Sequence, residues 1–162
     1  GWTHITNATQ ASAFATALAG TSRSFSGQTA PGSALNWAYP LFNSNGFEGL
    51  REVIDVSGDG SQNDGANTAA ARAAALAAGV DAINGLPIGG GATLVNWYTN
   101  NIQGGAGSFT LAADSFADFQ AAIEQKLARE ITGTVPEPIS AALVGLGLLG
   151  LGLTRRRQSQ KQ

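Results

Sequence analysis

The 162-residue chain is long enough for one domain and a tail, and with 43% hydrophobic residues that domain can build a real core. Residues 1–134 carry five basic and ten acidic side chains, a net charge of −5, which argues against nucleic-acid binding because nucleic acids require a basic surface. The absence of cysteine excludes a disulfide framework, a thiolate zinc site and a cysteine nucleophile.

The first half of the chain contains two predicted helices and one predicted strand. An alanine-rich run predicts a helix over Ala8–Leu18, with Asn7 or Thr9 as its N-cap. A loop rich in Gly, Ser and Thr separates it from a second helix over Ser33–Phe42. The apolar, β-branched run Arg51–Val56 then predicts a strand.

The second half continues this alternation of helices and strands. The predicted elements are a helix over Ala66–Ala78 ended by Gly79, a strand over Val80–Leu86, a helix over Leu94–Asn101, a strand-like segment over Ser108–Ala112 and a helix over Asp114–Ile131. Strands separated by helices indicate an α/β fold with a mainly parallel sheet. Three strands are few for this class and the chain contains no Met, so we expect further sequence upstream of Gly1.

The polar loop after the first predicted strand is the leading candidate site. In open α/β sheets ligands bind at the carboxyl ends of the strands, which is where Ser57–Gly65 lies. Its carboxylate, amide and hydroxyl oxygens suit Mg²⁺, Mn²⁺ or Ca²⁺. The alternative is an ordinary turn, because Asp-Gly and Asn-Asp-Gly favour turns. An EF-hand fits badly, since its twelfth position would be Ala66 or Ala70 instead of Glu.

Aromatic and histidine side chains give weaker signals. His4 is the only histidine, so neither a histidine-based zinc site nor a Ser-His-Asp triad is supported. A carbohydrate-stacking surface is one interpretation of the aromatic residues, and core packing is the simpler one. The residues concerned are Trp37, Tyr39, Trp97 and Tyr98.

The C-terminal segment has three distinct parts. Val135, Pro136, Glu137 and Pro138 precede an uncharged run over residues 139–154, and Arg155, Arg156 and Arg157 follow it. As a helix this run spans about 24 Å, slightly less than the roughly 30 Å hydrocarbon core, a gap that snorkelling arginines and local bilayer thinning can close. We therefore expect a transmembrane helix at 139–154, with the basic tail 155–162 in the cytoplasm and the body outside.

These three parts, in this order, resemble the PEP-CTERM sorting signal of Gram-negative bacteria. The resemblance implies that an exosortase, a membrane transpeptidase, cuts the precursor near the Pro-Glu-Pro motif. It further implies a precursor held temporarily in the inner membrane and a mature protein at the cell surface or outside the cell, often alongside exopolysaccharide production.

The body resembles a bacterial family of uncharacterised function whose members have a von Willebrand factor type A-like domain. The segments that carry this resemblance are 27–35, 51–60, 83–88, 104–109 and 116–131. It implies a doubly wound, Rossmann-type three-layer α/β fold over residues 1–132 that lacks its first strand. Residues 133–138 then form a linker to the transmembrane helix.

Type A domains often carry a metal-ion-dependent adhesion site that holds Mg²⁺ or Mn²⁺. The resemblance places its threonine at Thr29 and its aspartate at Asp59. The Asp-x-Ser-x-Ser loop of such sites has no counterpart. Asp55-Val56-Ser57 is superficially similar, but Asp55 lies within the predicted strand and the following Gly58-Asp59 breaks the pattern. We therefore expect this chain alone to bind a divalent cation poorly.

Three classes of function follow from these features. The leading interpretation is an exported cell-surface binding or adhesion module, not an enzyme, with a protein or an exopolysaccharide as its ligand. The alternative is a structural, extracellular-matrix-associated protein with a degenerate metal site. A hydrolase using loop carboxylates is the third, and it lacks an obvious acid–base pair.

Overall fold

The computed structural model describes residues 1–22 and 26–131, and this part of the chain is an α/β structure with a three-stranded mixed sheet and five α-helices. The chain divides into two compact units, Gly1–Ala122 and Ile123–Gln162. The predicted linker, transmembrane helix and basic tail lie outside the described residues. Among the helices within the described ranges, none combines the length and the apolar character needed to cross a membrane.

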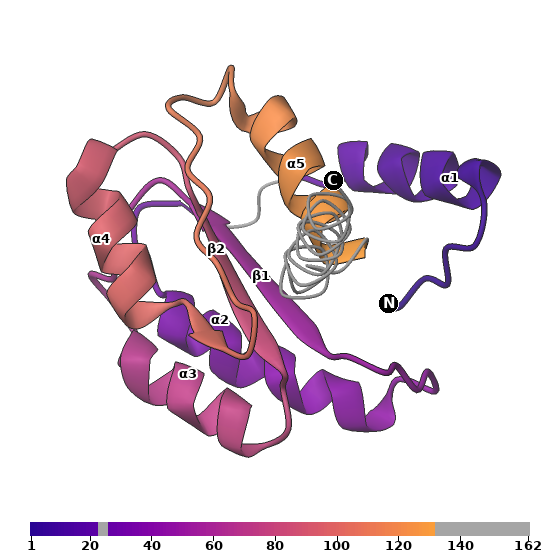
Figure 1. Cartoon of the computed structure of the whole chain (residues 1–162), viewed down its shortest axis with the longest axis horizontal. Helices are drawn as coiled ribbons and strands as arrows, with labels where there is room; N and C mark the ends of the chain where they lie inside the picture. Colours follow the sequence, from indigo (N-terminus) through magenta and orange to yellow (C-terminus); the bar gives the residue numbers. More distant parts are fainter. Residues whose placement is uncertain (23–25, 132–162) are drawn as a thin grey trace, which may run out of the picture. The chain divides into compact units, whose positions relative to one another are not determined.

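The sheet has the order β1-β2-β3. Strands β1 (Val53–Gly58) and β2 (Ala82–Pro87) lie side by side and pair in parallel (Figure 1). The short strand β3 (Gly104–Gly105) pairs antiparallel with the start of β2. The α/β class is therefore as predicted, while the sheet is mixed because of a strand that the sequence did not indicate.

The antiparallel strand β3 depends on glycine. Gly105 has a φ of +88°, and a Cβ at this position would collide with the backbone carbonyl oxygen of Asp81. Only a residue without a side chain lets the chain approach β2 so closely. The segment after β3, predicted as strand-like, is not a regular strand, but Thr110 forms a parallel bridge with Gly85 of β2 and Ala113 forms one with Ile88, the residue after β2.

Helices α2 (Pro31–Ala38), α3 (Thr68–Ala77) and α4 (Gly91–Asn101) pack on one face of the sheet (Figure 1). Their buried side chains form a core with Ile83 of β2, and Ile54 and Val56 of β1 pack against it. The helical members of this core are Leu35, Ala71, Ala75, Leu94 and Tyr98. Alternation along the strands directs Val53, Asp55 and Ser57 to the opposite face.

Asparagine caps determine where two helices begin. The Asn7 side chain, one of the two predicted caps, accepts a hydrogen bond of 3.0 Å from the Gln10 amide and caps α1 (Ala8–Ala19). The Asn67 side chain accepts one of 2.9 Å from the Ala70 amide. Because Asn67 is the cap, α3 begins at Thr68, two residues later than predicted.

Two other predicted helices have different limits. The α-helix predicted to reach Phe42 ends at Ala38 and continues as the 3₁₀ helix η1 (Tyr39–Ser44), because Pro40 lacks an amide hydrogen and disrupts the α-helical turn. Helix α5 (Phe119–Ile131) begins later than the predicted start at Asp114.

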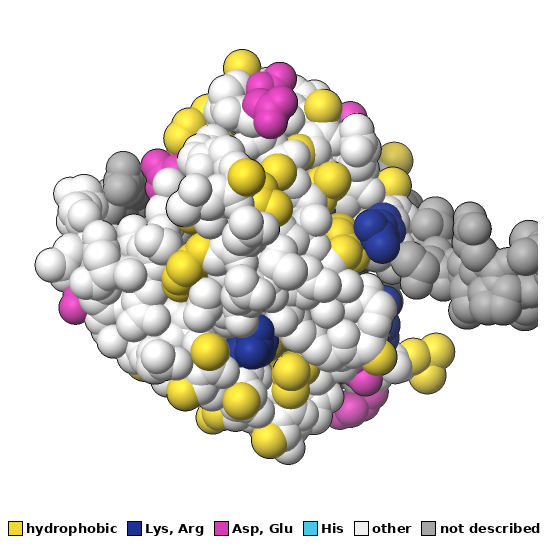
Figure 2. Space-filling view, turned by 60° about the vertical axis from the view of Figure 1, so that its left-hand side comes forward, with side chains coloured by type: hydrophobic (Ala, Val, Ile, Leu, Met, Phe, Trp, Pro, Cys, Tyr) yellow, Lys and Arg dark blue, Asp and Glu magenta, His cyan; other side chains and the backbone are white. Residues whose placement is uncertain are grey.

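The surface in Figure 2 shows hydrophobic side chains in small separate groups and few charged ones.

Candidate functional site

The loop that follows β1 is fastened to the segment before α2. The backbone amide of Thr29 donates a hydrogen bond of 2.7 Å to the Asn63 side-chain oxygen. The Thr29 carbonyl oxygen accepts bonds from the amides of Asn63 and Asp64, at 3.0 and 3.2 Å. The loop therefore holds Thr29 through both of its backbone polar groups.

A second attachment lies further along both segments, between Ser33 and Ala66. The Ala66 amide donates a hydrogen bond of 2.9 Å to the Ser33 hydroxyl. Gly65 has a φ of +71°, and a Cβ there would collide with the same hydroxyl. The turn therefore requires glycine both for its backbone conformation and for its close approach to α2.

These attachments bring the two predicted cation-binding residues to one end of β1. A Cβ built on Gly60 would lie 3.1 Å from the Thr29 hydroxyl oxygen, so this hydroxyl lies beside the residue that follows Asp59. Both residues offer hard oxygen donors, which suit Mg²⁺ and Mn²⁺. In the described ranges, no group of three or more His, Cys, Asp or Glu side chains could hold a metal ion.

Asp55 and Ser57 occupy a different place. The strand β1 extends to Gly58, beyond the predicted end at Val56, so both residues are strand residues. Alternation directs their side chains to the sheet face opposite the α2–α4 core. The Asp55-Val56-Ser57 segment therefore does not form a loop beside Thr29 and Asp59.

Tyr98 on α4 contributes a hydroxyl near the same end of β1. Its side chain is only 2% exposed, and its ring fits against two glycines of neighbouring strands. A Cβ on Gly58 would lie 2.8 Å from the Tyr98 hydroxyl, and one on Gly85 would lie 2.9 Å from the ring. Burial and, to a smaller extent, the Asp59 carboxylate raise the pKa of Tyr98 to about 12.

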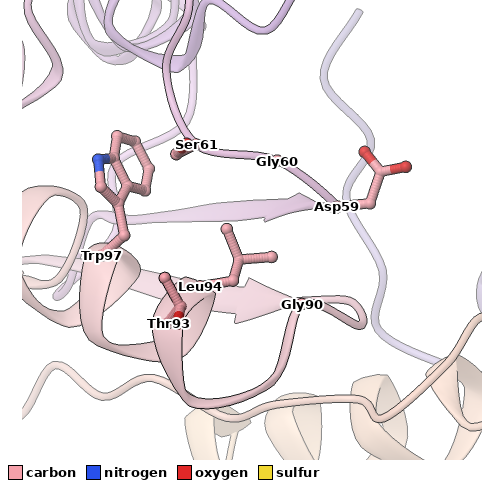
Figure 3. A pocket seen from close by; sticks show the side chains of 7 residues that line it. All are labelled: Asp59, Gly60, Ser61, Gly90, Thr93, Leu94 and Trp97. Carbon is pink, nitrogen blue, oxygen red and sulfur yellow. The ribbon is translucent and has the colours of Figure 1, made fainter.

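A cavity of about 280 Å³ lies between this loop and α4 (Figure 3). Trp97 stands at one end and Asp59 at the other, with Leu94 between them. Its lining residues are Asp59, Gly60, Ser61, Gly90, Thr93, Leu94 and Trp97. Sequence reasoning found Asp59 and Ser61 in the polar loop, but it missed Thr93 and Leu94, because only the packing of α4 brings them to the loop.

The four aromatic residues considered from the sequence have different environments. Tyr98 belongs to the core, and Tyr39 and Trp97 are partly buried against it. Trp37 is 72% exposed. Core packing therefore accounts for the position of Tyr98 and for the partial burial of Tyr39. Trp97 packs against the core and also lines the cavity.

Replacing Asn63 with alanine should lower the free energy of unfolding by about 1 kcal/mol, because the Thr29 amide loses its acceptor. Urea unfolding checks this value. Asn100→Ala, at an exposed position of α4, is the control and should change stability by less than about 0.5 kcal/mol. Equal effects of both substitutions would show that the Asn63 side chain does not hold this loop.

Comparison with protein families gives two matches. A family model described as a protein of unknown function (DUF1194) matches residues 1–135, and the PEP-CTERM protein-sorting motif matches residues 134–157. No curated protein and no solved structure matches the chain. The second match confirms the predicted sorting signal, whose residues lie outside the described part. It implies an exported protein that is anchored transiently in the membrane and processed by an exosortase.

Proposed function

The chain belongs to the family described as protein of unknown function (DUF1194) and carries a PEP-CTERM sorting motif, and from this premise we propose that it is an exported surface-binding module. In this proposal the body has a von Willebrand factor type A-like fold. The mature protein acts at the cell surface or outside the cell. Its binding site is the end of β1 with the loop that follows.

One observation carries this proposal: the Thr29 hydroxyl lies beside Gly60, next to Asp59, although these residues are about thirty positions apart in the sequence. Three hydrogen bonds with Asn63 and Asp64, one donated by the Thr29 amide and two accepted by its carbonyl oxygen, fix the Thr29 backbone there. The two side chains would hold Mg²⁺ or Mn²⁺, and a bound cation would supply open positions for water and for a carboxylate of the partner.

The same geometry favours binding over catalysis. A general base works best with a pKa near the operating pH, and the Tyr98 hydroxyl, with a pKa of about 12, stays protonated at neutral pH. Asp59 is exposed to solvent. The hydrogen bond that Thr29 makes with Asn63 involves its backbone amide, and not a pairing of its hydroxyl with a general base. A structural, matrix-associated protein with a degenerate site is the second candidate. This second candidate is supported because Thr29 and Asp59 supply only part of the oxygen shell that Mg²⁺ and Mn²⁺ take.

Calorimetric titration of Mn²⁺ into the full chain tests the site. We expect weak saturable binding, with a dissociation constant on the order of 1 mM, because few protein oxygens contribute. Asp59→Asn keeps the side-chain shape, removes the charge and should abolish binding. Asp64→Asn, in the same loop, is the matched control and should leave binding unchanged.

Two results would contradict the cation site. One is the absence of saturable heat, which would favour the structural alternative. The other is equal loss of binding in the Asp59 and Asp64 variants. It would indicate that Mn²⁺ is attracted to an acidic surface without a defined binding site.

A further inference from the structure

The cavity beside Asp59 combines an apolar wall with polar groups. Trp97 and Leu94 form the apolar part, Ser61 and Thr93 supply two hydroxyls, and Asp59 lies at the end far from Trp97 with its carboxylate directed away from Leu94 (Figure 3). Its volume of about 280 Å³ lies near the lower end of ligand pockets, which begin at roughly 300 Å³. The cavity thus has room for one small ring.

The aromatic wall is held in position before any ligand binds. The Trp97 ring packs against the core and meets the Tyr98 ring edge-on, with the ring centroids 5.6 Å apart. Its backbone carbonyl oxygen accepts a hydrogen bond of 2.9 Å from Asn101, which also fixes this turn of α4. A wall that is already ordered lowers the entropic cost of binding.

The arrangement of polar groups selects the kind of ligand. The Asp59 carboxylate and the net charge of −5 of residues 1–134 disfavour phosphates and acidic sugars. The hydroxyls of Ser61 and Thr93 would be left without partners by a hydrocarbon chain. Asp59 stands at the end opposite Trp97, so a cationic group paired with its carboxylate would leave the Trp97 ring uncovered (Figure 3).

A neutral pyranose ring satisfies all of these conditions. One face of such a ring carries C–H groups that can cover an indole, and its edge carries hydroxyls that can exchange hydrogen bonds with the hydroxyls of Ser61 and Thr93. We propose that the cavity between the loop after β1 and α4 binds one neutral sugar ring, stacked on Trp97 with its hydroxyls toward Ser61 and Thr93.

This inference rests on the proposed binding function and names the ligand class for the same end of the sheet. The sugar's contacts come from protein side chains, so its binding requires no cation. Sugar binding should therefore persist in EDTA, and the cation site and the sugar site can fail independently of each other.

The test uses the full chain in a zwitterionic detergent without a sugar headgroup. The probes are the methyl glycosides of glucose, galactose and mannose, with glucuronic acid and argininamide for comparison. We expect calorimetry in EDTA to show saturable binding of at least one neutral glycoside, with a dissociation constant on the order of 1 mM. Glucuronic acid and argininamide should bind at least tenfold more weakly.

Two variants locate the site. Trp97→Ala should abolish glycoside binding, while Trp37→Ala, which removes an exposed tryptophan outside the cavity, should leave it unchanged. Thr93→Val removes one hydroxyl at an exposed helix position and should weaken binding about fivefold without affecting folding. Circular dichroism confirms that the variants are folded.

Three results would overturn the proposal. The first is no saturable binding of any neutral glycoside. The second is tighter binding of glucuronic acid or argininamide, which would assign the cavity to an anionic sugar or to a cationic side chain. The third is glycoside binding that survives both Trp97→Ala and Thr93→Val, which would place the sugar elsewhere.

Discussion

Replacing Gly32 with alanine should destabilise the fold by about 3 kcal/mol, at the upper end of the usual cost of overpacking. Gly32 is buried in the first turn of α2, and a Cβ there would collide with the carbonyl oxygen of Ala66. It would also lie 2.9 Å from the carbonyl carbon of Asn67. Both are backbone atoms that cannot rotate away, so α2 would have to move from the loop before α3.

The sign of this effect is diagnostic. At an exposed position inside a helix, Gly→Ala stabilises by about 1 kcal/mol, so a large loss in the Gly32 variant can arise only from the close approach of α2 to this loop. Urea unfolding measures the change, and Asn36→Ala, exposed on the same helix, should stay within about 0.5 kcal/mol. A neutral or stabilising Gly32→Ala would show that α2 and the loop are further apart than described.

Gly32→Ala should also weaken any cation binding, because the segment that it displaces carries Thr29. Ser33, the next residue, receives the Ala66 amide bond, and Thr29 receives those of Asn63 and Asp64. A shift of α2 would therefore disturb both attachments. Comparing the Mn²⁺ titration of the Gly32 and Asn36 variants separates this loss from a general effect of mutation in α2.

Local signals predicted most elements of the fold. The alanine-rich runs became α1 and α3, and Asn7 caps α1 as its position suggested. The β-branched run became β1, shifted by two residues. Strand β3 could not be predicted, because Gly104 and Gly105 have no side chains to create a strand pattern, and their pairing depends on close backbone approach.

The candidate site could be predicted less completely. The polar loop was found, but several of its polar side chains act within the fold. The Gln62 side-chain oxygen accepts bonds of 2.9 Å from the amide and the hydroxyl of Thr68, and Asn63 holds Thr29. The turn interpretation therefore describes these residues, which form a structured turn, while cation binding at Asp59 stays a prediction. Contacts between residues more than thirty positions apart depend on tertiary packing, which composition and spacing do not reveal.

Tyr98 is the clearest case of a site residue whose role arises from packing. Its hydroxyl approaches Gly58 only because Gly58 and Gly85 lie on the same face of neighbouring strands, and because α4 turns Tyr98 toward them. A one-residue shift of β1 or α4 would remove this proximity. The sequence showed the three residues but not the register that aligns them.

Between pH 10 and 12 the chain should lose about 2 kcal/mol of stability, and Tyr98→Phe should remove this loss. In the unfolded chain Tyr98 has its ordinary pKa of 10.0, whereas in the folded chain burial and then Asp59 raise the pKa to about 12. The neutral phenol is favoured in the fold, so its contribution is fully present below pH 10 and is lost as the pH rises through 12. At about 1.4 kcal/mol per pKa unit, a rise from 10 to about 12 corresponds to nearly 3 kcal/mol in all, of which about 2 kcal/mol is lost between pH 10 and 12.

Urea unfolding at intervals from pH 9 to 12 tests this dependence in the native chain and in Tyr98→Phe, and the difference between the two cancels the titration of all other groups. Parallel loss of stability in both proteins would contradict the assignment to Tyr98.

Absorbance of the tyrosinate separates the two causes of the raised Tyr98 pKa. Asp59→Asn should lower the Tyr98 pKa only part of the way to 10, because burial is the larger cause.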